Sequence, residues 1–155
     1  MVKFKSRYLL VETLYEGEMN QPFDGGKISV VLKNQVESLF GDIGLGKLIK
    51  NLQVKYMNNY TNLLIIRVGK EHLKMLWSAL GLINDIEGVK TRMHVIGISG
   101  TIKRCEMKAK KHLERWMSNY ELLKNNIPPI VISKDERVRY ISFSKNFALF
   151  RLHFL

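Results

Sequence analysis

The sequence has very little cysteine and no long hydrophobic run. Its single cysteine, Cys105, excludes an internal disulfide bond and is typical of a protein in a reducing compartment. No apolar stretch approaches the roughly 20 residues of a membrane-spanning helix. The N-terminal residues alternate basic and apolar side chains, which is unlike a signal peptide. We therefore expect a soluble intracellular protein without a membrane partner.

Negative charge is also scarce. Asp and Glu together number 14, against 25 Lys and Arg. We find no paired carboxylates, no Ser-His-Asp arrangement and no carboxylate cluster of the kind that a two-metal nuclease requires. None of the four histidines (His72, His94, His112 and His153) stands at a metal-ligand spacing from Cys, Asp or Glu. The sequence therefore argues against an enzyme and predicts no metal or cofactor bound by the protein itself.

One stretch imitates a nucleotide-binding motif. Residues 41–47 (GDIGLGK) match the spacing G-x-x-x-x-G-K of a phosphate-binding loop. Such a loop needs Ser or Thr after the lysine to hold magnesium, and here Leu48 follows. It also joins a strand to a helix, whereas these residues are expected to form a turn from a helix to a strand. We therefore expect the glycines to serve a helix end and a tight connection.

Positive charge is what the sequence has in excess. The formal net charge is +11 in 155 residues, a length suited to one domain with a hydrophobic core. So basic a small protein favours a polyanionic partner, nucleic acid first and an anionic membrane surface second. Lys and Arg also occur on solvated faces that only keep a protein soluble, so their distribution along the chain decides between these interpretations.

Hydrophobic periodicity predicts an α/β sandwich of the α+β type. Apolar patterns predict four strands, over residues 2–15, 48–57, 63–68 and 93–102. Apolar residues at three- and four-residue steps predict helices over residues 27–40, 70–83 and 102–120. The first six elements follow the β-α-β-β-α-β order of an RRM-like or ferredoxin-like fold, with two helices on one face of a four-stranded antiparallel sheet. The third helix is expected on part of the other face or along one edge.

The third predicted helix is apolar on one side and basic on another. Its apolar side contains Ile102, Cys105, Ala109, Leu113, Trp116 and Tyr120. Its basic side, centred roughly 130° away at about 100° per residue, contains Arg104, Lys108, Lys111 and Arg115. The apolar side predicts a contact with the core, and the basic side predicts an anionic partner.

A second basic cluster lies at the N-terminus, where Lys3, Lys5 and Arg7 alternate with Phe4 and Tyr8. In the predicted order of elements the first and fourth strands lie side by side, so the two basic clusters are expected to merge into one surface. Lys and Arg neutralise phosphates, and an exposed Tyr or Phe can stack on an unpaired base. The predicted ligand is RNA, although the aromatic signature of an ordinary single-strand RNA reader is not evident.

Five short segments stand in an order and spacing that is specific when they are taken together. They are residues 1–10 (MVKFKSRYLL), 41–44 (GDIG), 54–61 (VKYMNNYT), 76–80 (LWSAL) and 99–103 (SGTIK). In these segments the chain resembles the Pop-five family, the protein subunits of eukaryotic and archaeal ribonuclease P and of ribonuclease MRP. The resemblance extends from residue 1 to about residue 120, roughly four-fifths of the sequence.

The resemblance implies an RRM-like sandwich and a non-catalytic RNA-binding subunit. Such a subunit braces the catalytic RNA and assists removal of the 5′ leader from precursor tRNA, while the RNA performs the cleavage with magnesium. The implied partners are ribonuclease P RNA and MRP RNA, a nearby precursor tRNA, a barrel-shaped subunit of the Rpp-thirty or Rpp-one type, and a second small RRM-like subunit or a second copy of the chain. The implied location is the nucleus and nucleolus.

Nine residues are predicted to contact RNA. The resemblance points to Val2, Lys3, Lys5 and Arg7 at the N-terminus and to Lys103 and Arg104 after the SGTI block. The basic side of the third helix adds Lys108, Lys111 and Arg115.

The C-terminal part departs from the family pattern, because it is aromatic and β-prone where members often end in an acidic or disordered tail. We expect an RRM-like domain over residues 1–120 and a C-terminal extension over residues 121–155 that contacts another subunit. Two alternatives stay open. One is an enzyme of the same fold that acts without RNA, and the other is a protein-interaction module whose charge serves only solubility.

Overall fold

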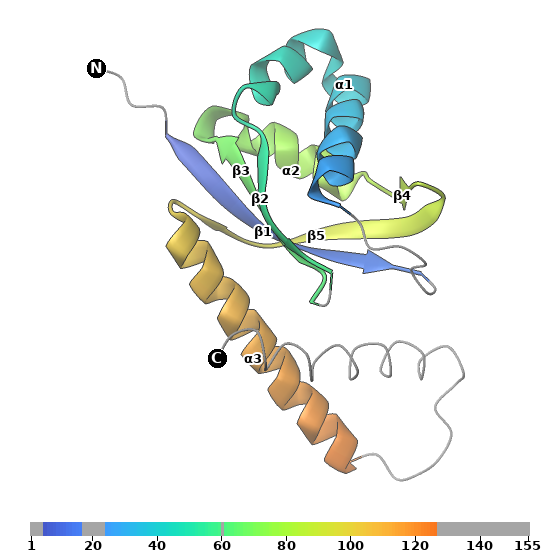
Figure 1. Ribbon diagram of the computed structural model, residues 1–155, viewed down its shortest axis with the longest axis vertical. Helices are drawn as coiled ribbons and strands as arrows, with labels where there is room; N and C mark the ends of the chain where they lie inside the picture. Colours follow the sequence, from blue (N-terminus) through green and yellow to red (C-terminus); the bar gives the residue numbers. More distant parts are fainter. Residues whose placement is uncertain (1–4, 17–23, 60, 127–155) are drawn as a thin grey trace. The chain divides into compact units, whose positions relative to one another are not determined.

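A curved antiparallel sheet organises the part of the chain that this computed structural model describes, residues 5–16, 24–59 and 61–126 (Figure 1). Its strands lie in the order β2-β3-β1-β5-β4. Their bounds are β1 Ser6–Tyr15, β2 Gln53–Asn58, β3 Leu63–Gly69, β4 Asp85–Ile86 and β5 Val89–Ser99. The helices are α1 Gly25–Ile49, α2 Leu73–Gly81 and α3 Ile102–Asn126, and the 3-10 turn η1, Lys70–His72, precedes α2.

The chain divides into two units, Met1–Ala109 and Lys110–Leu155, so the division falls inside α3. The first unit contains the sheet, α1, α2 and the first turns of α3. In the second unit the structure describes the rest of α3, which continues beyond the predicted end near Tyr120 to Asn126. The predicted β-prone arm from residue 127 onward lies outside the described residues, and the predicted domain boundary after residue 120 stays a prediction.

The pairing of the strands confirms the predicted topology. β1 lies at the centre of the sheet and pairs antiparallel with β3 on one side and with β5 on the other. The first and the last of the predicted strands are therefore neighbours, as the β-α-β-β-α-β order requires. β2 and β3 form the predicted antiparallel hairpin. The short strand β4, which pairs with the start of β5, was not predicted because two residues carry no periodicity.

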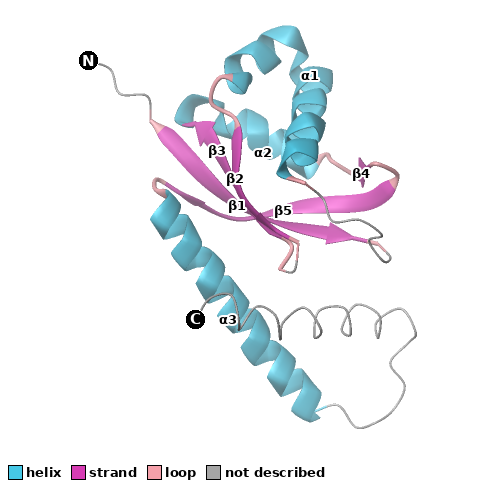
Figure 2. Cartoon of the chain, viewed as in Figure 1, coloured by secondary structure: helices cyan, strands magenta, loops and turns pink. Residues whose placement is uncertain are grey.

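The main core lies between one face of the sheet and helices α1 and α2 (Figure 2). Alternate residues of β1 and β3 face these helices, since side chains along a strand alternate between the two faces. The largest contributions come from fully or almost fully buried side chains of four elements: Leu9 and Val11 of β1, Leu64 and Ile66 of β3, Ile28 and Leu32 of α1, and Leu76 and Leu80 of α2.

The opposite face of the sheet carries a second, smaller core. Leu10 of β1 and Ile65 of β3 pack against Cys105 near the start of α3, and all three side chains are almost inaccessible to solvent. Tyr8, Ile96 and Ala109 surround this cluster. β3 carries apolar side chains on both faces, and both faces are covered by helices. The first turns of α3 lie on the face away from α1 and α2. This confirms the predicted place of the third helix.

Helix α1 changes direction at Gly41, whose φ of 66° lies in the left-handed region that glycine adopts without strain. The predicted helix end at this position is therefore correct. The predicted glycine-rich turn after it is wrong, because a helical segment continues to Ile49. Gly44 and Leu48 of this segment are buried. Helical spacing of four residues lets both face the core, whereas an open turn would expose Leu48.

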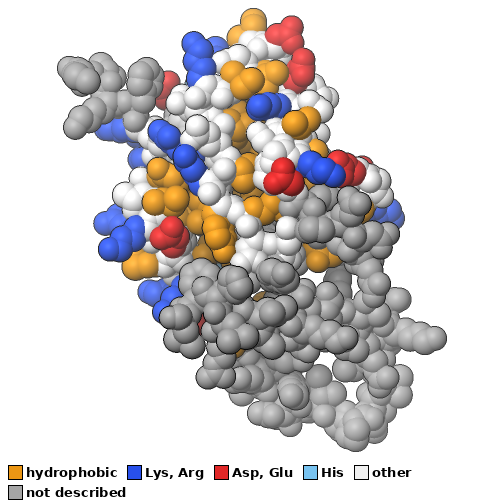
Figure 3. Space-filling view, viewed as in Figure 1, with side chains coloured by type: hydrophobic (Ala, Val, Ile, Leu, Met, Phe, Trp, Pro, Cys, Tyr) orange, Lys and Arg blue, Asp and Glu red, His pale blue; other side chains and the backbone are white. Residues whose placement is uncertain are grey.

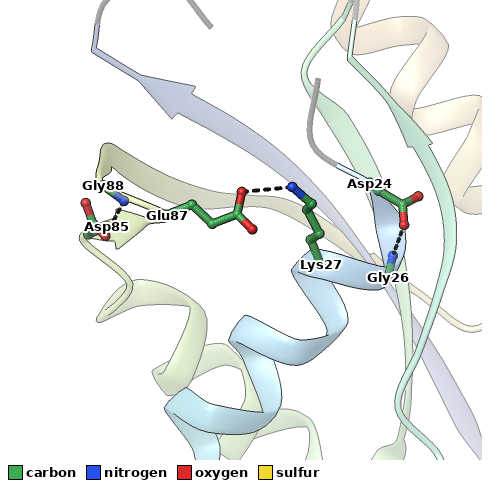
Figure 4. A network of polar contacts seen from close by, with 6 residues as sticks. All are labelled: Asp24, Gly26, Lys27, Asp85, Glu87 and Gly88. Atoms are coloured by element: carbon green, nitrogen blue, oxygen red, sulfur yellow. Dashed lines mark hydrogen bonds and ion pairs between the residues drawn. The ribbon is translucent and has the colours of Figure 1, made fainter. Parts of the chain in front are cut away.

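A network of polar contacts holds the start of α1 and the β4–β5 turn (Figure 4). The carboxylate of Asp24 accepts a hydrogen bond from the Gly26 backbone N–H at 3.2 Å and caps the helix. Lys27 Nζ lies 3.0 Å from Glu87 Oε2 in the turn that joins β4 to β5. Both side chains of this ion pair are about half exposed, so we assign it at most about 1 kcal/mol.

The remaining differences from the predicted elements concern boundaries. The first strand begins at Ser6 rather than at residue 2, where the chain lies outside the described residues. The last strand spans Val89–Ser99, and Ile102 begins α3 rather than ending that strand. α2 is preceded by η1 and ends at Gly81. Within the described residues, no helix is both long and apolar enough to cross a membrane.

Candidate nucleic-acid interface

Three segments that are distant in the sequence meet at one end of the sheet. They are the start of β1, the end of β3 with the residues that follow it, and the end of β5 with the start of α3. Ser6 pairs with Gly69, and Tyr8 pairs with both Arg67 and Ser99. The backbone N–H of Lys70 donates a hydrogen bond to the carbonyl of Lys5 at 2.8 Å, which closes the corner between β1 and η1.

This end of the sheet collects basic side chains, and we call it the basic sheet end. It is defined by six residues: Lys5, Arg7, Arg67, Lys70, Lys103 and Arg104. Arg7 and Arg67 are partly buried and the other four are exposed. Within the described ranges none of the six forms an ion pair with a carboxylate, while Lys27 and Lys90 elsewhere do. Their positive charge is therefore not neutralised by carboxylates of the described residues.

Each of the two arginines of the basic sheet end is held by a hydrogen bond to Ser6 at the start of β1. Arg67 Nε donates to Ser6 Oγ at 3.1 Å, and Arg7 Nη1 donates to the Ser6 carbonyl at 2.9 Å. Arg7 also lies against the turn before α3, because a Cβ at Gly100 would be 3.9 Å from Arg7 Nη1. A guanidinium has five donors in a fixed plane, so each arginine keeps donors for an anion after making these bonds.

The start of α3 adds to the positive potential of this region. Thr101 Oγ1 accepts a hydrogen bond from the Arg104 backbone N–H at 3.4 Å, and the Thr101 carbonyl accepts one from the N–H of Cys105 at 3.2 Å. The N-terminus of a long helix carries a partial positive charge from its aligned peptide dipoles. Lys103 and Arg104 stand in this first turn, where no acidic residue offsets them.

The structure brings together four of the nine predicted contact residues: Lys5, Arg7, Lys103 and Arg104. Val2 and Lys3 lie outside the described residues. Lys111 and Arg115 are exposed on the part of α3 that belongs to the second unit. Lys108 belongs to the first unit, and its ammonium donates to the Ile98 carbonyl at 2.7 Å.

Sequence reasoning missed Arg67 and Lys70. The signal for Arg67 was present, since it is the single charged residue in the apolar strand LLIIRVG, where a buried cation would be costly unless it lies at an end of the sheet. Lys70 had no such signal, because it reaches the basic sheet end through the backbone contact of its own N–H with Lys5.

Cys105, the single thiol, belongs to the first turn of α3, packs against the sheet and has no solvent access. Burial raises its pKa from 9.0 to about 11, against a smaller lowering by Lys108. We expect alkylation at pH 8 to be about 100-fold slower in the native protein than in denaturant, because only an opened chain exposes the thiolate. Equal rates with and without denaturant in a thiol-labelling time course would contradict the burial of Cys105.

The same shift has a consequence for stability. In the unfolded chain the thiol ionises near its ordinary value of 9.0, while the native thiol keeps its proton to about pH 11. The native state therefore binds more protons between these values, so the contribution of Cys105 to stability is complete below pH 9 and is lost as the pH rises toward 11.

Among the described residues, no cluster of side chains is suited to bind a metal ion. In residues 5–16, 24–59 and 61–126, no group of three or more His, Cys, Asp or Glu side chains is arranged so that it could hold a metal ion. The glycines of the G-x-x-x-x-G-K stretch lie in the kinked helix α1 and do not form a loop between a strand and a helix. The basic sheet end therefore offers a ligand positive charge and not a set of metal ligands.

Comparison with known proteins bears on the family of the chain. The family model described as Rpp14/Pop5 family matches residues 7–110. The ribonuclease P/MRP protein subunit POP5 of Schizosaccharomyces pombe is 36% identical over 134 residues, which cover 79% of this chain and 96% of that protein. The ribonuclease P protein component 2 of Pyrococcus furiosus is 31% identical over 104 residues, which cover 67% of this chain and 82% of that protein.

A chain in the cryo-EM structure of yeast ribonuclease MRP has a TM-score of 0.48 and 12% identity over 79% of this chain and 98% of its own length. The match of the family model spans the sheet, α1, α2 and the first turns of α3. It includes five of the six residues of the basic sheet end, all except Lys5. On the extent of this match and the identity to the Schizosaccharomyces pombe subunit, the chain belongs to the Rpp14/Pop5 family.

Proposed function

We propose that this chain is a non-catalytic, RNA-binding protein subunit of ribonuclease P and of ribonuclease MRP. In this role it braces the catalytic RNA and assists removal of the 5′ leader from precursor tRNA. The basic sheet end contacts the phosphate backbone of the RNA, and Val2, Lys3, Lys111 and Arg115 are further proposed contact residues. The relatives named as ribonuclease P/MRP subunits support this assignment.

One observation carries the RNA-binding part of the proposal. Six cations from three separate segments gather at one end of the sheet without carboxylate partners among the described residues. A solvated surface that only keeps a protein soluble needs no such convergence, because positive charge spread over any face serves that purpose. A row of phosphates, in contrast, requires several cations within a short distance of one another.

In the proposed complex the chemistry belongs to the RNA. Magnesium ions would be held by the RNA and would supply the cleavage chemistry there, and the protein supplies positive charge and shape. This division of labour agrees with the scarcity of carboxylates in the sequence, since a protein that binds two catalytic magnesium ions needs several of them. We place the complex in the nucleus and nucleolus, as the resemblance implies.

The proposal includes protein partners. By resemblance these are a barrel-shaped subunit of the Rpp-thirty or Rpp-one type and a second small RRM-like subunit or a second copy of the chain. The described surface supports contacts of this kind, because it exposes large apolar side chains on α1, on α2 and at Leu82, which directly follows α2 (Figure 3). Examples are Ile43, with 75% of its surface accessible, and Trp77, with 48%.

The test is purification of the tagged chain from its own cells, followed by sequencing of the bound RNA and an assay of precursor-tRNA cleavage by the eluate. We expect one or two structured RNAs in stoichiometric amount and removal of the 5′ leader. Treatment of the eluate with a nuclease that degrades RNA should abolish the cleavage.

Each alternative has its own result in this experiment. Cleavage that survives the nuclease treatment would mean that the protein itself is an enzyme and would overturn the proposal. Recovery of proteins without any enriched RNA would mean a protein-interaction module. A filter-binding titration with the recovered RNA then checks the charge argument, because log affinity should fall with log salt by about 0.7–0.9 for each phosphate contact.

A further inference from the structure

Lys108 occupies an unusual position for a lysine on a basic helix face. Its Nζ donates to the backbone carbonyl of Ile98 at 2.7 Å, a short distance that is typical of a charged donor. The bond joins α3 to the end of strand β5, across the corner formed by residues 99–101. The sequence pattern placed Lys108 in the same stripe as Arg104, and both residues are exposed, so the bond to Ile98 is what distinguishes Lys108.

We propose that Lys108 is a clamp that fixes the start of α3 on β5, and that it does not contact RNA phosphates. The clamp is a property of the folded chain and holds whether or not the proposed RNA-binding function is correct. The statement about phosphates rests on the proposed function.

The residue beneath the lysine stem supports the clamp. A Cβ at Gly97 would lie 3.3 Å from Lys108 Cδ, 3.5 Å from Nζ and 4.0 Å from Cε. The stem therefore passes over Gly97, where an added Cβ would lie a few tenths of an ångström too close to Lys108 Cδ unless the stem shifts. The pairing of β1 with β5 also shifts beside Gly97, between Leu10 and Val11, so the strand is irregular where the lysine lies on it.

The neighbours of Lys108 on the helix place it at the border of the second core. Cys105, one turn earlier, is fully buried, and Ala109, the next residue, packs against the same cluster of Leu10 and Ile65. At about 100° per residue, Lys108 stands roughly 60° around the helix from Cys105, at the border of the buried face. The ammonium thus binds the Ile98 carbonyl of β5 beside this cluster.

The clamp is tested with Lys108→Met, which keeps the length of the stem and removes the donor. The readout is alkylation of Cys105 at pH 8 in the full chain without denaturant, because the thiol reacts only when α3 lifts from the sheet or the chain unfolds. We expect alkylation to be about tenfold faster than in the unsubstituted chain, as for a lost bond to a charged donor. The missing charge alone would act in the opposite direction, since Lys108 lowers the Cys105 pKa.

Three further variants sharpen the result. Lys108→Arg keeps a cationic donor and should restore slow alkylation. Gly97→Ala should speed alkylation by displacing the stem, and its effect should not add to that of Lys108→Met because both act on one contact. Lys103→Met is the matched control, since it removes an exposed lysine from the same helix end and should leave alkylation unchanged.

The salt dependence of binding to the recovered RNA separates the clamp from a phosphate contact. Lys108→Met should leave the slope of log affinity against log salt unchanged, whereas Lys103→Met should reduce it by about 0.7–0.9. Unchanged alkylation in Lys108→Met would overturn the clamp. A reduced slope in Lys108→Met would overturn its exclusion from the RNA contact. If none of the variants binds RNA, the proposed function fails and the alkylation result still decides the clamp.

Discussion

Neutralising four cations of the basic sheet end, as Arg7→Gln/Arg67→Gln/Lys103→Gln/Arg104→Gln, is expected to weaken RNA binding by about three orders of magnitude at physiological salt. The estimate follows from a loss of roughly tenfold for each phosphate contact, reduced because Arg67 and Arg7 also make bonds within the protein. The measurement is a binding isotherm with the RNA that copurifies with the chain, at several salt concentrations. The slope of log affinity against log salt should fall by roughly three.

A matched control separates local contact from net charge. Lys27→Gln/Lys33→Gln/Lys90→Gln/Arg92→Gln removes the same charge from α1 and from the start of β5. If long-range attraction alone held the RNA, the two fourfold variants would lose affinity equally. We expect the control to lose less than about tenfold, because charges farther away than a Debye length of roughly 8 Å are screened. Equal losses would overturn the assignment of the interface to the basic sheet end.

Replacing Gly44 with alanine is expected to lower the free energy of unfolding by about 2 kcal/mol. Gly44 is buried in the second segment of α1, where an added Cβ would overlap the Cβ of Phe40 and lie 3.8 Å from Met75 Sδ. Overpacking of this kind costs about 1–3 kcal/mol, and the higher helix propensity of alanine offsets part of it. Denaturant unfolding followed by circular dichroism gives the change directly.

Gly46 provides the control in the same helical segment. It is exposed, and an added Cβ would meet no atom within 4 Å. Gly46→Ala should therefore stabilise the chain by about 0.5–1 kcal/mol through helix propensity. Opposite signs for the two variants are expected only if residues 42–49 are helical. Similar effects at both positions would favour the flexible turn that the glycines alone predict.

The order of the elements was determined by the sequence, because each element has a periodicity that its own side chains carry. The alternation in β1, the doubly apolar β3 and the apolar stripe of α3 follow directly from which residues must leave water. The β-α-β-β-α-β order also predicts that β1 and β5 are neighbours, and this pairing brings Arg7 to the same end of the sheet as the start of α3. The charge of +11 already pointed to a polyanion.

Contacts between segments were decided only by the tertiary structure. Arg67 and Lys70 join the basic sheet end because β3 pairs with β1 in one particular register, and a register shift of one residue would turn Arg67 to the other face. The helical segment after Gly41 forms because it places Gly44 and Leu48 against the core, against the local preference of three glycines for a turn. Lys108 shares its spacing with Arg104 and Lys111, and only the course of β5 beneath it provides the Ile98 carbonyl that its ammonium binds. Local periodicity specifies which face of an element is apolar, but a polar side chain finds its partner only through packing between elements.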